Sequence, residues 1–497
     1  MHTKRVNGKE NMNPERQPTL VMKFGGTSVG SPQAMRQAGQ IVLEEMQAWP
    51  RMVVVTSAMS GVTNLLLKTA EQAVRGETQA IAQAAQSLIS MHFAVIDQLI
   101  EDEDETVRVK RAIDRLIQDF ANLCQAIGVL GEATPRALDA VASLGERLSV
   151  RLLSAALRQM GLQAHAVEAT NLIVTDRHFQ SALPDFQATS ANIQRFLIPM
   201  LAQRQVPVVT GFIGATPDGV ITTLGRGGSD YSAAILGALL PSDEVWIWTD
   251  VDGVMSADPR LVPEARTIPR LTYREIAELA YYGAKVVHPK TIRPVINAGI
   301  GLRVCNTFNP SHPGTRLIAE EGQTGDGSTL SQGLIRAVTA IRGQKLLTIE
   351  GRGMLGVPGV AARAFGAVAA TGTSVPLITQ SSSEQSICFA VPAEAAGRVM
   401  GAMQEAFAIE LKRSDIDRIW ATEEVVIITV VGAGMRHTPG IAGRIFGALG
   451  EQHVNVIAIA QGSSEVSVSM VVDYSQSERA VRALHRLIVS EGVPYDG

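Results

Sequence analysis

Several classes of protein are excluded by what this sequence lacks. Only three of its 497 residues are cysteine, and Cys124, Cys305 and Cys388 are widely separated and form no Cys-x-x-Cys pair. A disulfide framework or a cysteine zinc site is therefore not expected, and this usage fits a reducing compartment. Aromatic residues make up 4 % of the chain, and 44 Lys plus Arg nearly balance 48 Asp plus Glu. A dedicated nucleic-acid binder would need more of both stacking rings and positive charge.

Long apolar stretches and familiar metal and nucleotide motifs are missing as well. Apolar runs such as residues 233–240 fall well short of the ~18 residues that span a bilayer. The first 18 residues lack the apolar core of a secretory signal, so we expect a flexible tail over 1–18 and a cytoplasmic protein. No Walker A or His-Glu-x-x-His motif occurs, and the nine histidines are scattered. A histidine-based metal site is therefore not predicted.

The first 315 residues alternate between apolar strands and helical segments. Residues 19–24 form a β-prone run that ends in two glycines, followed by a helical pattern and an apolar strand at 52–56. This order is typical of an α/β sheet with buried parallel strands. Residues 65–157 are almost wholly helical in pattern, and the acidic run at 101–105 indicates a solvated loop or a helix start. Further strand signals stand at 206–209, 220–223, 244–249 and 301–305.

An internal repeat follows a polar linker predicted at 316–333. Residues 351–391 align without gaps on residues 432–472, and 18 of these 41 positions are identical. Two copies of one supersecondary unit are therefore present, each with the βαββα order of ferredoxin-like folds. Gly351, Gly353 and Gly356 have Gly-x-Gly-x-x-Gly spacing, but the second copy lacks the third glycine. We interpret them as turn glycines and not as a dinucleotide site.

The ends of the two copies predict how they pack. The first copy can finish with a strand at 408–411, whereas the second ends after its helix. Residues 334–341, just after the linker, form a spare strand. We predict that this strand completes the sheet of the second copy, so that the first repeat is inserted within the second. The predicted domains are 19–315, 344–412, and 334–341 plus 425–490.

Two glycine-rich motifs are candidates for a ligand site. Lys23 stands at a strand end beside two glycines, and bare amides next to an ammonium suit phosphate oxygens. The alternative is a solvated lysine beside a helix-start turn. Within 223–230, three glycines flank Arg226, and such an arginine fits a carboxylate or phosphate. Asp230 in the same segment could be only a helix N-cap.

Other charged residues lie in apolar surroundings. Asp250 follows an apolar strand, where α/β sheets bind ligands, although a simple Asp-Gly turn would also explain it. Lys285 follows a helix beside another glycine. Glu146 and Arg147 lie in an apolar helical stretch, and an ion pair between them is the alternative to a ligand role.

The order of these motifs resembles that of the aspartate kinase family. The chain contains, in sequence, VMKFGGTSVG, VTSAMSGVTN, SLGERLS, TTLGRGGSDYSA, TDVDGVMSADPR and YYGAKVVHPKT. The resemblance extends from Thr19 to the C-terminus and implies the amino-acid kinase fold, an α/β fold with a mainly parallel open sheet between helices. The repeat resembles the tandem ferredoxin-like βαββαβ ACT domains of this family. The implied reaction is ATP-dependent phosphorylation of the L-aspartate side chain to 4-phospho-L-aspartate, the first step toward lysine, threonine, methionine and isoleucine.

The resemblance also implies roles for individual residues. Lys23 would stabilise the transferring phosphoryl group, and Asp230 would orient the active-site lysines. Glu146 would bind the ammonium of aspartate, and Arg226 one of its carboxylates. The full substrate-binding set is Thr63, Glu146, Arg226, Gly227, Gly228 and Ser229. The nucleotide-binding set is Lys23, Phe24, Gly25, Gly26, Thr249, Asp250, Met255, Arg260, Lys285 and Val286. Mg²⁺ would accompany ATP, held mainly through the nucleotide phosphates, with no metal site formed by the protein itself.

The regulatory repeat is more similar to threonine-sensitive bifunctional aspartate kinase–homoserine dehydrogenases than to lysine-sensitive enzymes. In that group a glutamine matching Gln380 or Gln461 contacts the effector, although both glutamines could instead only close a turn. Threonine is the favoured inhibitor and lysine the alternative. The chain ends at Gly497 without a dehydrogenase domain. A homodimer or higher homo-oligomer joined through the ACT domains is implied, with no nucleic-acid or membrane partner.

Two other functions predict a different sequence. A glutamate or carbamate kinase of the same fold would lack the helix with Glu146 and the tandem repeats. A non-catalytic amino-acid sensor would have a decayed kinase half, whereas the charged residues Lys23, Glu146, Arg226, Asp230 and Lys285 are all present.

Overall fold

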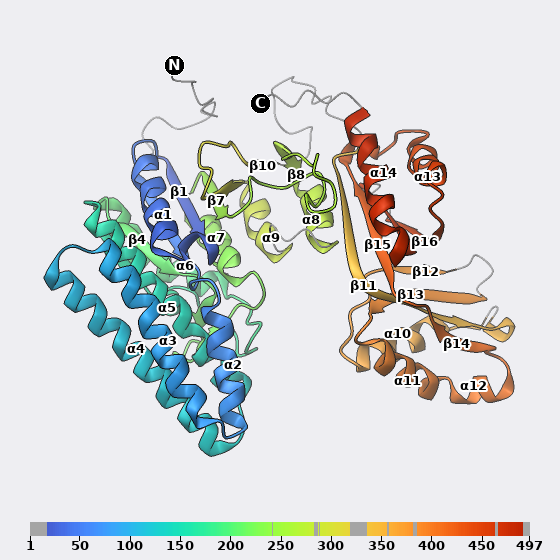
Figure 1. Ribbon diagram of the computed structural model, residues 1–497, viewed down its shortest axis with the longest axis horizontal. Coiled ribbons are helices and arrows are strands. Elements are labelled where there is room, and N and C mark those ends of the chain that lie inside the picture. The colour runs from blue at the N-terminus through green and yellow to red at the C-terminus, as the bar shows by residue number, and fades with distance from the viewer. Residues whose placement is uncertain are drawn as a thin grey trace. The chain divides into compact units, whose positions relative to one another are not determined.

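The structure is a computed structural model that describes residues 17–240, 242–282, 287, 289–318, 335–354, 357–380, 385–462 and 466–490. Its contacts divide the chain into two units (Figure 1). The first unit comprises the residues up to Gly253 together with Val287–Ala319, and the second comprises Val254–Val286 and the residues from Glu320 onward. No described helix combines the length and the apolar character that crossing a bilayer requires. Most of the predicted tail at 1–18 and of the predicted linker at 316–333 lies outside the described residues.

The first unit is built on a mostly parallel sheet, which confirms the α/β class. Its strands lie in the order β3 (Ala164–Val167), β4 (Val206–Thr210), β2 (Arg51–Thr56), β1 (Thr19–Phe24), β7 (Glu244–Thr249), β9 (Gly301–Asn306) and β10 (Thr315–Ile318). Neighbours are parallel from β3 to β9, and β10 is antiparallel to β9. All six residues of β1 are buried, because both faces of a parallel sheet are covered by helices. The carboxyl ends of β1, β2, β4 and β7 therefore share one edge.

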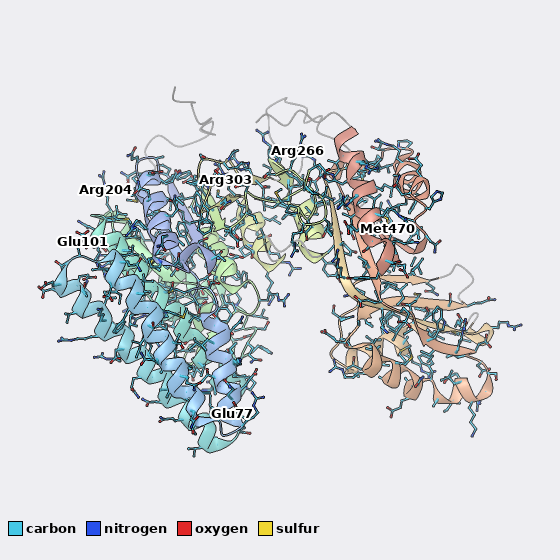
Figure 2. The ribbon with its side chains drawn as sticks, in the orientation of Figure 1. Glu77, Glu101, Arg204, Arg266, Arg303 and Met470 are labelled. Atoms are coloured by element: carbon cyan, nitrogen blue, oxygen red, sulfur yellow. The ribbon has the colours of Figure 1, made fainter. Side chains whose placement is uncertain are left out.

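The first unit contains both long and short helices, and some of them begin at a capping side chain. The helices are α1 (Pro32–Glu45), α2 (Val62–Val74), α3 (Thr78–Leu99), α4 (Glu103–Leu130), α5 (Pro135–Gln159), α6 (Phe186–Ala202), α7 (Gly228–Leu239) and α9 (Pro289–Ala298). Asp102 caps α4, so the acidic run is a helix start. Figure 2 labels Glu77 and Glu101 at the two ends of α3. Two short strands, β5 (Ile213–Ala215) and β6 (Ile221–Thr223), form an antiparallel pair.

The second unit carries both repeats on one seven-stranded sheet. The strand order is β12 (Ile378–Gln380), β13 (Ser386–Pro392), β11 (Ala337–Glu350), β15 (Val425–Val431), β17 (Ser467–Asp473) and β16 (Val456–Gln461), and β14 (Arg418–Ala421) pairs with β11. The first repeat has helices α10 (Val360–Ala370), α11 (Ala396–Ala406) and α12 (Ala408–Arg413), and the second has α13 (Ile441–Glu451) and α14 (Ser477–Ser490). Each repeat has its own apolar core, centred on residues such as Phe389 in the first and Met470 in the second.

Strand β11 belongs to both repeats. Residues 337–341 pair with β15, the register shifts between Ile341 and Gln344, and residues 344–350 pair with β13. The pairing with β15 is the one predicted for the spare strand at 334–341. One continuous strand therefore links the two ACT-like halves.

The strand predicted at 408–411 is wrong. These residues form α12, and the closing strand of the first repeat is β14, which pairs with residues 347–350 of β11. The segment Ala-Ile-Glu-Leu-Lys-Arg is composed mainly of good helix formers, and its basic residues lie in the last turn, where they favour the helix dipole. The Arg-Ile-Trp-Ala sequence of β14 has the β-branched and aromatic residues that favour a strand.

The segment Val254–Val286 belongs to the second unit. It contains β8 (Arg270–Thr272) and α8 (Tyr273–Tyr281). The buried carboxylate of Glu275 accepts a hydrogen bond from the amide of Ala433 at 2.7 Å. Glu278 accepts another from the Ser467 hydroxyl at 2.8 Å. Helix α8 is thus attached to the second repeat by two carboxylates.

A buried histidine makes the stability of the first unit sensitive to pH. His92 on α3 is fully buried, and its Nδ1 lies 2.7 Å from the Leu88 carbonyl. Burial lowers the pKa of His92 to about 4, although the Leu88 carbonyl acts in the opposite direction. The unfolded chain takes up a proton near pH 6.5, so folding stability falls as the pH drops from 6.5 toward 4.

We expect His92→Gln to remove this pH dependence, because glutamine does not titrate. Between pH 7.5 and pH 5 the wild type should lose ~2 kcal/mol of unfolding free energy more than the variant. Urea unfolding of both proteins at the two pH values measures this difference. His165→Gln, at an exposed histidine, is the matched control and should behave as the wild type. Parallel losses in the wild type and His92→Gln would contradict the prediction.

Candidate active site

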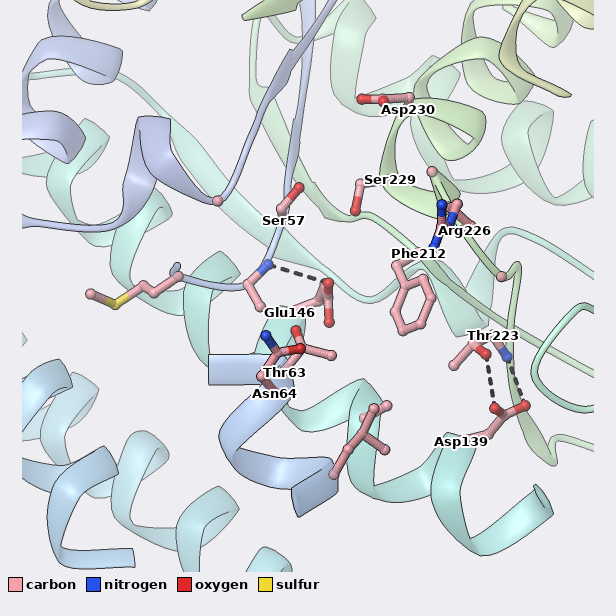
Figure 3. A pocket seen from close by; sticks show the side chains of 18 of the residues that line it. Ser57, Thr63, Asn64, Asp139, Glu146, Phe212, Thr223, Arg226, Ser229 and Asp230 are labelled. Atoms are coloured by element: carbon pink, nitrogen blue, oxygen red, sulfur yellow. Dashed lines mark hydrogen bonds between the residues drawn. The ribbon is translucent and has the colours of Figure 1, made fainter. Parts of the chain in front are cut away.

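A cavity of about 560 Å³ lies at the carboxyl edge of the first unit's sheet (Figure 3). Its walls are the end of β1, the loop after β2, the first turn of α2, one face of α5 and the loop before α7. Every residue of the predicted substrate-binding set lines this cavity, together with Lys23 and Asp230. The structure therefore brings together motifs that are up to about 200 residues apart in the sequence.

Lys23 and Asp230 form an ion pair in the wall of the cavity. The Lys23 Nζ lies 2.5 Å from Asp230 Oδ1, and the two side chains are only 10 % and 14 % exposed. Lys23 is thus not a solvated strand-end lysine. Asp230 is not the N-cap of α7 either, since Gly227 holds that position and Asp230 lies in the first turn. The pair places the Lys23 ammonium at the end of the central strand, with Asp230 balancing its charge.

The turn after β1 requires glycine at Gly26. A Cβ atom there would lie 3.0 Å from the Ala58 carbonyl oxygen, so a larger residue would push the two loops apart. The Gly25 amide donates a hydrogen bond to the Trp248 carbonyl at 3.0 Å, so it is engaged with β7 in this structure. The ring of Phe24 is buried and stacks on Trp248. Only the backbone of Phe24 can therefore face a ligand.

Glu146 is a buried carboxylate with unused hydrogen-bonding capacity. It lies on α5, is 4 % exposed, and its Oε1 accepts a hydrogen bond from the Ala58 amide at 3.3 Å. Its Oε2 has no hydrogen-bond partner among the described residues. Burial raises the pKa of Glu146 to about 8, although the Ala58 amide and the Lys23 charge lower it. Arg147 pairs with Glu168 instead, so the alternative of an ion pair between Glu146 and Arg147 is wrong.

The loop before α7 places Arg226 on another wall of the cavity (Figure 3). Gly225 and Gly227 have φ values of +78° and +69°, which favour glycine on either side of Arg226. Gly228 is fixed by packing, since a Cβ atom there would lie 2.6 Å from the ring of Phe212. A buried carboxylate, that of Glu146, and a guanidinium, that of Arg226, thus line the same cavity.

Several lining residues were missed by sequence reasoning. These are Ser57, Asn64, Asp139, Gln180 and Phe212, of which Figure 3 labels all but Gln180. Asp139 precedes Glu146 by seven residues, a spacing that places both on one helix face, and that signal could have found it. Phe212 has a φ of +68°, which is unusual for an aromatic residue. No pattern in the sequence predicts this backbone conformation.

The predicted nucleotide-binding residues are divided between the two units. Thr249 ends β7 in the first unit and Asp250 follows it, and the Thr249 hydroxyl donates to the Asp250 carboxylate. Met255 and Arg260 belong to the second unit, and Arg260 forms a surface ion pair with Asp258. Lys285 and Val286 lie outside the described residues.

Gln380 and Gln461 occupy matching places in the two repeats. They end β12 and β16, respectively, and both are exposed. Residues of the two strands approach each other to within 8 Å between Cα atoms. The Ser-Ser-Glu turns that follow the two glutamines lie outside the described residues.

Comparisons with known proteins find one family in the first 306 residues, including the segment 254–286 of the second unit, and another in the two repeats. Residues 18–306 match the amino acid kinase family, and residues 347–407 and 428–487 each match an ACT domain. The first match covers more than half of the chain, so the chain belongs to the amino acid kinase family.

Comparison with individual proteins narrows the assignment of the chain within this family. The bifunctional aspartokinase/homoserine dehydrogenase of Daucus carota is 37 % identical over 94 % of this chain and 50 % of its own length. The chain spans about half the length of such bifunctional relatives. The aspartokinase of Schizosaccharomyces pombe is 32 % identical over 94 % of this chain and 92 % of its own.

Solved structures that resemble this chain include aspartokinases as well. Aspartokinase III of Escherichia coli, in complex with aspartate and ADP, has a TM-score of 0.78 and 31 % identity, covering 95 % of this chain and 100 % of its own. The same enzyme in complex with lysine and aspartate gives a TM-score of 0.75 and 31 % identity, covering 95 % of this chain and 99 % of its own. From its motifs, its two units and these relatives, the chain belongs to the aspartokinase family.

Proposed function

We propose that this chain transfers the γ-phosphoryl group of ATP to the side-chain carboxylate of L-aspartate, giving 4-phospho-L-aspartate and ADP. We further propose that an amino acid bound at the ACT domains inhibits the reaction, as part of the synthesis of the aspartate-derived amino acids. The three free cysteines fit a reducing compartment, so we propose the cytoplasm as its location.

The catalytic proposal rests on one observation. A single cavity contains a buried carboxylate with an unused oxygen, an arginine on another wall, and the Lys23–Asp230 pair. An amino dicarboxylic acid offers an ammonium for Glu146 and a carboxylate for Arg226. Its second carboxylate would then lie toward Lys23, where a phosphoryl group needs positive charge.

The proposed reaction needs no covalent intermediate between the substrate and the protein. The aspartate side-chain oxygen attacks the γ-phosphorus, the bond to the bridging oxygen of ADP breaks, and the negative charge passes to ADP. The Lys23 ammonium neutralises charge on the transferred group, and Asp230 keeps that ammonium in place at 2.5 Å. Thr63, Ser229 and the amides of Gly227 and Gly228 would position the amino acid, since alignment supplies much of the rate.

The nucleotide is proposed to bind through Lys23, Phe24, Gly25, Gly26, Thr249, Asp250, Met255, Arg260, Lys285 and Val286, from their match to the family's motifs. Mg²⁺ would be held mainly through the nucleotide phosphates, because these oxygens are its usual ligands in kinase sites. No group of three or more His, Cys, Asp or Glu side chains suited to a metal occurs among the described residues.

The ACT sheet is the proposed site of both regulation and assembly. Threonine is the favoured effector and lysine the alternative, with Gln380 and Gln461 as contacts. Three isoleucines on the same strands, Ile378, Ile457 and Ile459, are 44–48 % exposed. Such exposed apolar side chains support the proposal that a second copy of the chain joins there.

Aspartate-dependent formation of ADP tests the catalytic proposal. We expect Lys23→Ala to lower kcat at least ~100-fold, because one preorganised charge at the phosphoryl group is lost. A coupled assay with Mg-ATP and aspartate measures the rate. Lys68→Ala, at an exposed lysine on α2, is the matched control and should retain wild-type kcat. Folded wild type without aspartate-dependent turnover would refute the proposal, and near-normal turnover by Lys23→Ala would remove Lys23 from the mechanism.

The pKa of Glu146 predicts a pH dependence for aspartate. Only ionised Glu146 can pair with the ammonium, and its pKa of about 8 leaves it largely protonated at pH 7. The value of kcat/KM for aspartate should therefore rise with pH up to about 8. Glu146→Gln should lower kcat/KM at least ~30-fold and abolish this rise, whereas Glu71→Gln on the exposed face of α2 should preserve it. A Glu146→Gln profile parallel to that of the wild type would contradict the assignment.

Titrations with threonine and lysine test the regulatory proposal. We expect threonine to inhibit the wild type at lower concentration than lysine. Gln380→Ala or Gln461→Ala should raise the half-inhibitory threonine concentration ~10-fold, the value of about one hydrogen bond. Gln404→Ala, at an exposed glutamine on α11, should leave it unchanged. Full threonine inhibition in both glutamine variants would exclude the two residues as effector contacts.

A further inference from the structure

A second carboxylate in the cavity wall joins the segments that surround the amino acid. Asp139 lies on α5 and is 1 % exposed. Its oxygens accept hydrogen bonds from the Gln180 amide at 3.0 and 3.1 Å, from the Thr223 amide at 2.9 Å and from the Thr223 hydroxyl at 2.8 Å. Figure 3 shows the two bonds to Thr223. One side chain is thus bonded to two segments that are 41 and 84 residues away.

These two segments also pack against each other beside Arg226. Thr223 ends β6 and leads directly into the loop with Gly225 and Arg226. The Ala182 amide donates to the Thr223 carbonyl at 2.9 Å. A Cβ atom on Gly225 would lie 3.0 Å from the Gln180 carbonyl oxygen. The position of the Arg226 loop therefore depends on the segment that Asp139 holds.

Asp139 and Glu146 are two helical turns apart on the same face of α5. A rigid helix thus carries both the ammonium acceptor and the group that fixes the carboxylate-binding loop. The relative positions of the groups that bind the ammonium and the α-carboxylate of the amino acid are set along this path. Asparagine cannot replace Asp139 without loss, because its NH₂ group would face the amide and hydroxyl donors.

We propose that Asp139 is a positioning residue that sets the spacing between Glu146 and the Arg226 loop, and so holds the ammonium and the α-carboxylate of the bound amino dicarboxylate, with its side-chain carboxylate toward Lys23. The proposal rests on the proposed function of this cavity. Asp139 itself does not touch the reacting atoms in this role. It acts through Thr223 and Gln180, and its removal should affect how well aspartate binds more than how fast bound aspartate reacts.

Two neighbouring threonines on β6 provide the test. Thr223→Val removes the side-chain bond to Asp139, and Thr222→Val removes an equally buried hydroxyl that bonds Thr175 at 2.6 Å instead. We expect Asp139→Asn to raise the KM for aspartate at least ~10-fold and Thr223→Val to raise it ~3-fold. In both variants kcat and the KM for ATP should change less than 3-fold, and Thr222→Val should match the wild type.

A higher KM for aspartate at a steady kcat and a steady KM for ATP is the readout that general destabilisation would not produce. This rise should occur in Asp139→Asn and Thr223→Val and be absent in Thr222→Val. If Asp139→Asn does not fold, the comparison of Thr223→Val with Thr222→Val tests the proposal. Calorimetric titration measures the affinity of each variant for aspartate without turnover. A failure of the kinase proposal would instead be seen in the turnover assay of the wild type. Unchanged aspartate affinity in Thr223→Val would overturn the inference.

Discussion

The ammonium of Lys23 lies at the end of a strand whose residues are all buried, and Asp230 balances this charge. Removing either partner would leave an uncompensated charge in a poorly hydrated wall, which typically costs several kcal/mol. The pair therefore fixes the start of α7 against β1. The glycine loop before α7 must end at that point, and it brings Arg226 and Ser229 to the cavity. The arrangement of the site follows from charge balance in the fold.

Local patterns in the sequence predicted the parts of the structure that depend on local chemistry. The buried strand β1 was visible as an apolar run and the shared fold of the repeats as 18 identities, whereas the acidic cluster indicated either a loop or the helix start that α4 shows. Lys23 and Asp230 were marked by the glycines beside them. The contacts of Asp139 were not predictable in this way, because its partners are 41 and 84 residues distant and none of them is an unusual residue.

Tertiary contacts also decided two features that local patterns described wrongly or incompletely. Residues 408–411 were predicted as a strand, but β14 is the strand that pairs with residues 347–350 of β11, and residues 408–413 form α12. The segment containing α8 follows β7 directly in the sequence. Glu275 attaches this segment to the second repeat, because its carboxylate accepts a hydrogen bond from the amide of Ala433, 158 residues later in the sequence.

The path of the chain between the two units limits how this protein can be divided. It passes from one unit to the other after Gly253, after Val286 and after Ala319. Ala257 and Val262, from the short middle passage, lie in the same apolar core as Ile428 and Met470 of the second repeat. A gene fusion that exchanged only the sequence after residue 319 would leave part of this core behind. The module that recombination can transfer intact is the repeat region together with residues 254–286, which are separated from it in the gene.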